Sequence, residues 1–321
     1  MAMFFLPTLV LAASLSPARM QHHARELRIQ GFTVIPDAGL DPATVDKAHA
    51  TMTSEFARHL ASIEQLGLDP QEDKYAFQEI ATRHRKRWCL RPTRPSAWTS
   101  LLDDAVRAVT PIIESCSSSF PHADDGSPLT SLTRYTPLFT RPRVEEIGAI
   151  LSADGARAQT FHADAGPAHI QLARHLPAHR LYNVFAPLVD IEADADGTQF
   201  WPGSHLDRTR ASAYYDAIDR SGSLADDPIV SAQLVSPAIP KGGLLLWDFR
   251  CMHRGLPNAQ RRDRPVAHAV LSTGLAWDVL ELPDEGLDDA LAKLPSDPAE
   301  REALSRARKE EWARVRASSK R

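Results

Sequence analysis

Apolar positions recur at helical spacing in two stretches of the first third of the chain. Asp41 and Pro42 suit the N-cap and first position of a helix. Apolar or small residues then follow every three or four positions, which predicts a helix from Pro42 to about Gln65. A second helix is predicted over 100–116. Residues 31–36 are apolar and β-branched and end at a proline, which predicts a short strand ahead of both helices.

Past residue 146 the pattern changes to short apolar runs. They occupy 147–151, 181–189, 244–247 and 266–272, and Gly, Pro and Asp separate them. This punctuation is typical of an antiparallel barrel or sandwich. The stretch 297–320 is instead densely charged with alternating signs, and it predicts a solvated C-terminal helix. The fold class predicted is therefore mainly β with flanking helices.

Composition narrows the class of protein. The 321 residues include 37 Lys or Arg and 41 Asp or Glu, for a net charge of −4. Proteins that bind nucleic-acid phosphates usually carry an excess of basic residues, so the negative net charge argues against nucleic-acid binding. The three cysteines form no CxxC pair, which argues against a disulfide scaffold and a structural zinc knuckle. We expect a globular enzyme or ligand binder with a small-molecule partner and no nucleic acid.

Residues 3–18 are set apart by their lack of charge. They are too short, and too interrupted by Pro7, for a stable membrane span of ~20 residues. The stretch fits the core of a signal or organellar targeting segment, although no basic residue precedes it. The alternative is an apolar extension packed on a cytoplasmic domain.

The sharpest chemical signal is His162-Ala163-Asp164, with His253 much later in the chain. Residues i and i+2 of a strand point to one face, so His162 and Asp164 can bind the same ion. A distant histidine brought alongside by the fold completes three ligands. Two histidines and one carboxylate form the facial triad of non-haem Fe(II) oxygenases, which leaves positions open for a co-substrate and O2. Because the chain has 13 histidines, HxD alone is weak.

The surrounding motifs make the signal specific. In order along the chain they are Gln159, Asp196-Gly197-Thr198, Pro202-Gly203-Ser204-His205, His253-Arg254-Gly255 and Arg264. In these residues the chain resembles the phytanoyl-CoA dioxygenase (PhyH) family, whose members are Fe(II)- and 2-oxoglutarate-dependent oxygenases. The resemblance is closest over 159–275. It implies a double-stranded β-helix (jelly-roll, cupin-like) core.

The resemblance also implies roles for particular residues. His162, Asp164 and His253 would ligate iron, and Arg264 would hold the distal carboxylate of 2-oxoglutarate through a charge-assisted, bidentate pair. Thr198 and Gln159 would contact the same co-substrate. Related halogenases replace the carboxylate ligand by Ala or Gly, so the presence of an aspartate favours oxidation over halogenation.

The function predicted is that of an Fe(II)- and 2-oxoglutarate-dependent dioxygenase. It would use O2 to hydroxylate an aliphatic small molecule or acyl derivative, with release of succinate and CO2. The alternative is a non-catalytic jelly-roll protein that binds a metal or another ligand. We expect a possible targeting segment at 1–18 and one oxygenase domain at 19–321. That domain divides into helical support at 19–145, a jelly-roll core at 146–280 and the charged helix at 297–320.

Other polar residues have simpler interpretations. The loop histidines His169, His175 and His179 are interpreted as solvent-facing, and His205 as a hydrogen-bonding residue of its turn. His268 is expected in the core or pocket wall. Cys251 is expected either to line the site or to be an ordinary buried thiol. The basic run from Arg83 to Arg87, with Arg91 and Arg94, either binds an acidic substrate or is a solvated face. Because Trp88 is interleaved with these charges, one side of the segment is expected to pack near the pocket mouth.

Overall fold

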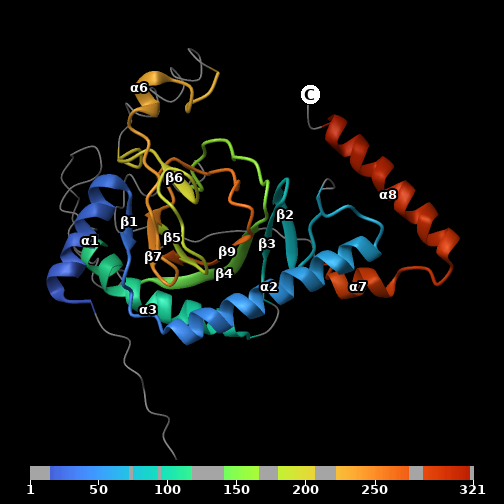
Figure 1. Ribbon diagram of the computed structural model, residues 1–321, viewed down its shortest axis with the longest axis horizontal. Coiled ribbons are helices and arrows are strands. Elements are labelled where there is room, and N and C mark those ends of the chain that lie inside the picture. The colour runs from blue at the N-terminus through green and yellow to red at the C-terminus, as the bar shows by residue number, and fades with distance from the viewer. Residues whose placement is uncertain are drawn as a thin grey trace, which may run out of the picture.

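The protein is built around one large antiparallel sheet, seen in a computed structural model that describes residues 15–71, 75–92, 95–117, 141–165, 180–206, 222–274 and 285–318 (Figure 1). The sheet has seven strands in the order β1-β7-β5-β9-β4-β3-β2. Their bounds are β1 Phe32–Ile35, β2 Ile80–His84, β3 Arg87–Leu90, β4 Arg143–Ser152, β5 Leu181–Pro187, β7 Leu244–Asp248 and β9 Arg264–Ser272. Each of the four predicted apolar runs coincides with one of these strands, although the run 181–189 extends two residues past the end of β5.

A second, two-stranded sheet pairs β6 (Thr198–Phe200) with β8 (His253–Gly255). Phe200 joins the two sheets: its ring stacks on that of Phe32 at 4.4 Å and meets the indole of Trp247 edge-on at 5.8 Å. An apolar cluster therefore fills one end of the space between the sheets. The predicted fold class, mainly β with flanking helices around a two-sheet jelly roll, is confirmed.

Helices cover the outer face of the large sheet, where α2 and α3 run beneath it in Figure 1. The α2 helix begins as predicted, because the side chain of Asp41 accepts a hydrogen bond from the backbone N–H of Thr44 at 2.9 Å. The helices are α1 Pro17–Gln30, α2 Pro42–Gln65, α3 Ala97–Ser117, α6 Pro228–Ser231, α7 Leu287–Ala292 and α8 Pro298–Ser318. Both predicted N-terminal helices and the charged C-terminal helix are present.

The central strand β9 shows how the sheet separates core from cavity. Alternate side chains of a strand point to opposite faces. Four residues of β9 at every second position, Arg264, Val266, His268 and Val270, face a cavity between the sheets. Ala267 and Ala269 face the other way and are fully buried in the main apolar core with the helices. The sheet is thus packed on one face and carries the polar interior of the cavity on the other.

The hairpin of β2 and β3 was not predicted, because charges interrupt its alternation. The basic run lies at its turn, where Lys86 has a positive φ of 57°. The segment 19–145, expected as helical support, therefore also supplies β1, β2 and β3 to the large sheet. Pro17 and Ala18 of the expected targeting segment begin α1, and residues 1–14 lie outside the described part. The division of the chain into 1–18 and a single domain stays a prediction.

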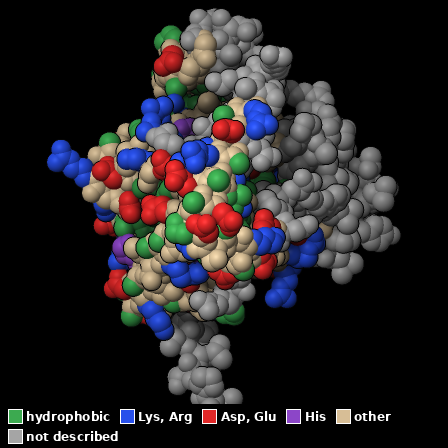
Figure 2. All heavy atoms as spheres, turned by 90° about the vertical axis from the view of Figure 1, so that its right-hand side faces the viewer, with side chains coloured by type: hydrophobic (Ala, Val, Ile, Leu, Met, Phe, Trp, Pro, Cys, Tyr) green, Lys and Arg blue, Asp and Glu red, His purple; other side chains and the backbone are tan. Residues whose placement is uncertain are grey.

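On the face shown in Figure 2, acidic and basic side chains are intermixed. Helix α8 lies at the periphery, where Ser305 Oγ donates to the carbonyl of Gly67 at 2.8 Å. Among the described residues, no helix combines the length and apolar character needed to cross a membrane.

Candidate metal centre

His162, Asp164 and His253 come together as the sequence predicted. Their candidate ligand atoms all lie within 4.8 Å of one another. The Nε2 atom of His162 is 3.6 Å from Oδ1 of Asp164, and that of His253 is 3.5 Å from Oδ2. Two imidazoles and one carboxylate on one side of a common point match the facial donor set of non-haem iron sites.

Backbone pairing positions the two histidines. His162 and His253 form an isolated antiparallel bridge, in which each backbone N–H donates to the other's carbonyl at 2.9 Å. Each ring places Nδ1 at 2.9 Å from a nearby carbonyl, that of Thr160 for His162 and that of Cys251 for His253. If Nδ1–H donates in both rings, Nε2 keeps its lone pair for a metal.

Aromatic side chains surround the buried member of the triad. The ring of His253 lies 5.5 Å from the indole of Trp247 and 5.9 Å from the ring of Phe200. This burial lowers the pKa of His253, although Asp164 opposes the shift. The neutral imidazole, which is the form that ligates metals, is therefore favoured at neutral pH.

The carboxylate ligand is held from strand β5. Asn183 Nδ2 donates to Oδ2 of Asp164 at 2.7 Å, which fixes the carboxylate plane. The side chain of Asp164 is 28% exposed and that of His162 is 38% exposed. The candidate metal point is therefore open towards the cavity and closed on the side of His253.

The triad opens into a cavity of about 400 Å³ between the sheets. At one end of it lies Arg264, which forms an ion pair with the buried Asp196. A second buried guanidinium, that of Arg87, lies beside it. Nη2 of Arg264 and Nη2 of Arg87 donate to the same carbonyl, that of Leu256, at 3.2 and 2.9 Å.

This end of the cavity has an excess of positive charge. Burial lowers the pKa of Arg87 to about 10, and burial together with the charge of Arg87 also lowers the pKa of Arg264. Both groups remain protonated at neutral pH. Among the described residues at this end, the two guanidinium groups are accompanied by a single carboxylate, that of Asp196. The two arginines are therefore suited to bind a further anion. Sequence reasoning identified Arg264 by its motif, whereas it treated Arg87 only as part of a basic run for which both an acidic ligand and a solvated face were considered.

The position of Arg87 explains why residue 255, in the motif His253-Arg254-Gly255, is a glycine. A Cβ atom on Gly255 would collide with the guanidinium of Arg87 and with Oε1 of Gln159. That same Oε1 accepts a hydrogen bond from the backbone N–H of Gly255 at 2.9 Å. Gln159 therefore lines the cavity and holds β8 in place through this hydrogen bond. Thr198, which pairs with Gly255 from β6, also lines the cavity.

The turn before Thr198 also requires its glycine. Gly197 has a φ of +80°, and a Cβ there would collide with the side chain of Ile191. Asp196 Oδ1 accepts from the backbone N–H of Gly197 at 2.8 Å. The aspartate thus shapes the turn and pairs with Arg264 at the same time.

A comparison with known families decides the relationship. A model of the phytanoyl-CoA dioxygenase (PhyH) family matches residues 27–266, well over half of the chain. The chain belongs to this family. The predicted resemblance is therefore confirmed.

Solved structures of related shape are more distant. The α-ketoglutarate-dependent epimerase SnoN is 15% identical, with 80% of this chain and 81% of that chain covered and a TM-score of 0.48. The carbocyclase SnoK is 17% identical, with 89% and 94% covered and a TM-score of 0.46. EctD from S. alaskensis with 2-oxoglutarate and 5-hydroxyectoine is 14% identical, with 81% and 79% covered and a TM-score of 0.47. No inference about the reaction is drawn from them.

Other residues that the sequence singled out lie in or near this site. His205 Nε2 lies 3.1 Å from the carbonyl of Arg28, in the structural role expected of it. Cys251 is fully buried in the cluster between the sheets and is not among the cavity-lining residues. His268 lines the cavity, and burial lowers its pKa to about 3. His169, His175 and His179 lie outside the described residues.

The residues of the basic run lie on both faces of the β2–β3 hairpin. Arg83 is exposed and lines the cavity mouth, and Arg91 pairs with Glu146 at 2.8 Å. Trp88 instead faces the helices, with Nε1 donating to the carbonyl of Pro70 at 2.9 Å. Alternation along β3 turns Trp88 to the packed face of the sheet, whereas Arg83 and Arg87 of the same segment line the cavity. Arg94 is outside the described residues.

Proposed function

We propose that this protein is an Fe(II)- and 2-oxoglutarate-dependent dioxygenase that hydroxylates an aliphatic small molecule or acyl derivative. It would release succinate and CO2. The observation that carries the proposal is the convergence of His162, Asp164 and His253 on one point, in a chain of the phytanoyl-CoA dioxygenase family. A dependence on iron and 2-oxoglutarate agrees with that family and that donor set.

The residues fit the metal by their chemistry. Two imidazole Nε2 atoms and a carboxylate suit iron(II), and a facial set leaves room for a bidentate keto acid and O2. Bound together, iron and 2-oxoglutarate supply the oxidising power of this enzyme class. The protein holds the ligand side rigid: carbonyls orient both imidazoles, and Asn183 orients the carboxylate of Asp164.

The cationic end of the cavity fits the distal carboxylate of 2-oxoglutarate. Arg264 would receive it, held in place by Asp196 and the Leu256 carbonyl. Arg87, which donates to the same carbonyl, would supply the second positive charge. Thr198 and Gln159 would contact the co-substrate, since both line the same cavity as Arg264 and the triad.

The remaining walls favour an apolar substrate portion. Phe185, Phe249 and Val270 line the cavity, with Trp247 beside the triad. Apolar walls exclude water from the reacting centre, which limits side reactions of the oxidant. An aliphatic C–H bond needs no polar partner in the protein, so these walls suit a hydroxylation of such a bond.

The test is 2-oxoglutarate turnover by iron-loaded protein in air. Purified protein is supplied with Fe(II), ascorbate and 2-oxoglutarate, alone and with a panel of fatty acids and acyl thioesters, and succinate is quantified. We expect succinate in every sample, more of it with a substrate, and a product heavier by one oxygen atom. If protein shown to contain iron forms no succinate above an iron-only control, the proposal fails and the non-catalytic alternative replaces it.

A further inference from the structure

A second group of two histidines and one carboxylate lies on helix α1, away from the triad. His22, His23 and Glu26 place their candidate ligand atoms within 4.8 Å of one another, the same limit that the triad meets. Nε2 of His22 is 3.5 Å from Oε1 of Glu26, and Nδ1 of His23 is 3.6 Å from Oε2. His22 and Glu26 are four residues apart and therefore share a helix face.

The group is anchored on one side and accessible on the other. His23 is 5% exposed and packs against β1, where its Nδ1 lies 2.9 Å from Oγ1 of Thr33. Thr33 donates to Oε2 of Glu26 at 2.5 Å. The side chain of His22 is 64% exposed and that of Glu26 is 30% exposed. An ion can therefore enter from solvent and meet donors whose positions are already restrained.

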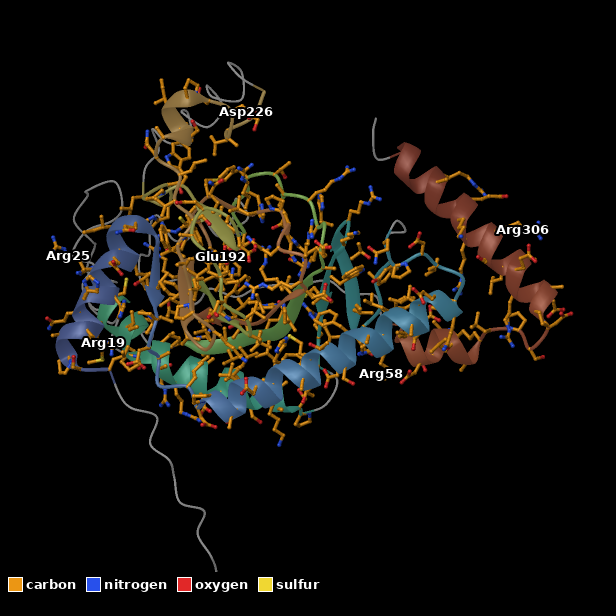
Figure 3. All side chains as sticks on the ribbon, in the orientation of Figure 1. Arg19, Arg25, Arg58, Glu192, Asp226 and Arg306 are labelled. Atoms are coloured by element: carbon orange, nitrogen blue, oxygen red, sulfur yellow. The ribbon has the colours of Figure 1, made fainter. Side chains whose placement is uncertain are left out.

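A cation on the same helix, Arg19, has other partners. Arg19, labelled with Arg25 on α1 in Figure 3, is turned towards Asp37, with Nη2 3.1 Å from its carbonyl and Nη1 3.6 Å from its carboxylate. An open cavity of about 710 Å³ borders all three candidate ligands. It leaves room for water to complete a coordination shell.

We propose that His22, His23 and Glu26 form a second divalent-metal site, of the zinc class, that joins α1 to β1. Two imidazoles, one carboxylate and a water are a ligand set that Zn²⁺ accepts in tetrahedral geometry. The metal takes the place of the hydrogen bond between His23 Nδ1 and Thr33. Thr33 keeps its hydrogen bond to Oε2 of Glu26, and Oε1 faces the metal together with His22.

The end of helix α1, which carries the proposed site, contacts the segment that leads to His253. The carbonyl of Gly31, just after α1, accepts from the backbone N–H of Asp248 at 2.9 Å. The thiol of Cys251, two residues before His253, lies 3.7 Å from the carbonyl of Gln30. A metal that fixes α1 against β1 therefore stiffens the layer on which the His253 segment rests. It takes no part in the reaction.

The test is calorimetric titration of the metal-free protein with Zn²⁺ alone. The background variant His162→Ala/His253→Ala removes two triad ligands, so zinc bound by this variant reports other sites. We expect one Zn²⁺ per chain on this background and two on the wild type. Adding His22→Gln should weaken the remaining site by about 100-fold or more, because loss of a ligand exceeds the 10–100-fold typical of residues that only support one.

Matched controls separate a specific site from histidine-rich surface binding. His49→Gln, on helix α2, removes another histidine and should leave both stoichiometry and affinity unchanged. If the background variant does not fold, the wild type and His22→Gln alone still differ by one zinc per chain. Equal zinc binding with and without His22, or with Glu26→Gln, would overturn the proposal. Neither result depends on whether the triad turns over 2-oxoglutarate.

Discussion

The triad and the α1 group offer similar donors in different settings. His162 and Asp164 are two residues apart, and His253 comes from a distant segment that the assembled sheets bring beside them. Aromatic rings close the His253 side. His22, His23 and Glu26 lie within little more than one turn of a helix and face solvent on one side. The donor set alone therefore does not define an oxygenase centre.

The surroundings make the difference between the two groups. Beside the triad lie a cavity between the sheets and two buried arginines that can receive a dicarboxylate. Beside the α1 group lies an open cavity without such a pair among its described lining residues. Redox chemistry with 2-oxoglutarate requires the first setting, whereas structural metal binding is possible in the second.

The largest expected effect follows from removing the carboxylate of the triad. Asp164→Ala should reduce succinate formation to background, because iron loses its only anionic protein ligand and Asn183 loses its partner. The side chain is partly exposed, so the fold should survive. Succinate assays and thermal unfolding on the same sample check both statements. Wild-type turnover in this variant would remove Asp164 from the metal site.

The cationic end of the cavity should control co-substrate affinity. Arg264→Met should weaken 2-oxoglutarate binding by about 2–5 kcal/mol, as expected when one partner of a buried charge pair is truncated. Because Asp196 also loses its partner, unfolding should be followed in parallel. Titration of 2-oxoglutarate into the iron-loaded variant measures the effect. An unchanged Kd would place the distal carboxylate elsewhere.

Arg87 should contribute to the same binding step by a smaller amount. Arg87→Met should raise the KM for 2-oxoglutarate while iron affinity stays the same, since this residue touches no metal ligand among its described contacts. Arg85→Met, in the exposed hairpin turn, is the matched control. Similar KM values in the two variants would show that Arg87 has only a packing role.

Crowding of the same region can be tested without changing charge. Gly255→Ala adds a methyl group where the guanidinium of Arg87 and the amide of Gln159 lie. We expect a loss of about 1–3 kcal/mol in the free energy of unfolding, as for other overpacked sites, with a rise in the KM for 2-oxoglutarate. Chemical denaturation and steady-state kinetics provide the two values. A variant as stable and active as the wild type would show that Arg87 moves freely.

The smallest effect is expected at the α1 group. His22→Gln should change the free energy of unfolding by less than about 0.5 kcal/mol in metal-free protein, because the side chain is exposed. Turnover at the triad should be unchanged. Added Zn²⁺ should raise the thermal midpoint of the wild type but not of this variant. A loss of turnover on His22→Gln would mean that the two groups are coupled.

The two groups also show what a sequence can reveal. The triad was predicted because its ligands lie in recognisable motifs with a fixed order, even though His253 is distant in the chain from the other two. The α1 group was missed, although its spacing is local, because histidines among charged residues look like a solvated face. Arg87 was considered only as one member of a basic run that either binds an acidic substrate or is a solvated face. Its role emerges only when Gly255 and Leu256 of a distant segment are brought against it.

The most direct test of the central claim is an anaerobic titration with Fe(II) and then 2-oxoglutarate. We predict the weak visible charge-transfer band of an iron–keto-acid chelate, its absence in His253→Ala, and its persistence in His22→Gln. Admission of air should then discharge the band and yield succinate. If iron-loaded wild-type protein binds 2-oxoglutarate without this band, or forms it equally well without His253, then His162, Asp164 and His253 are not the iron site.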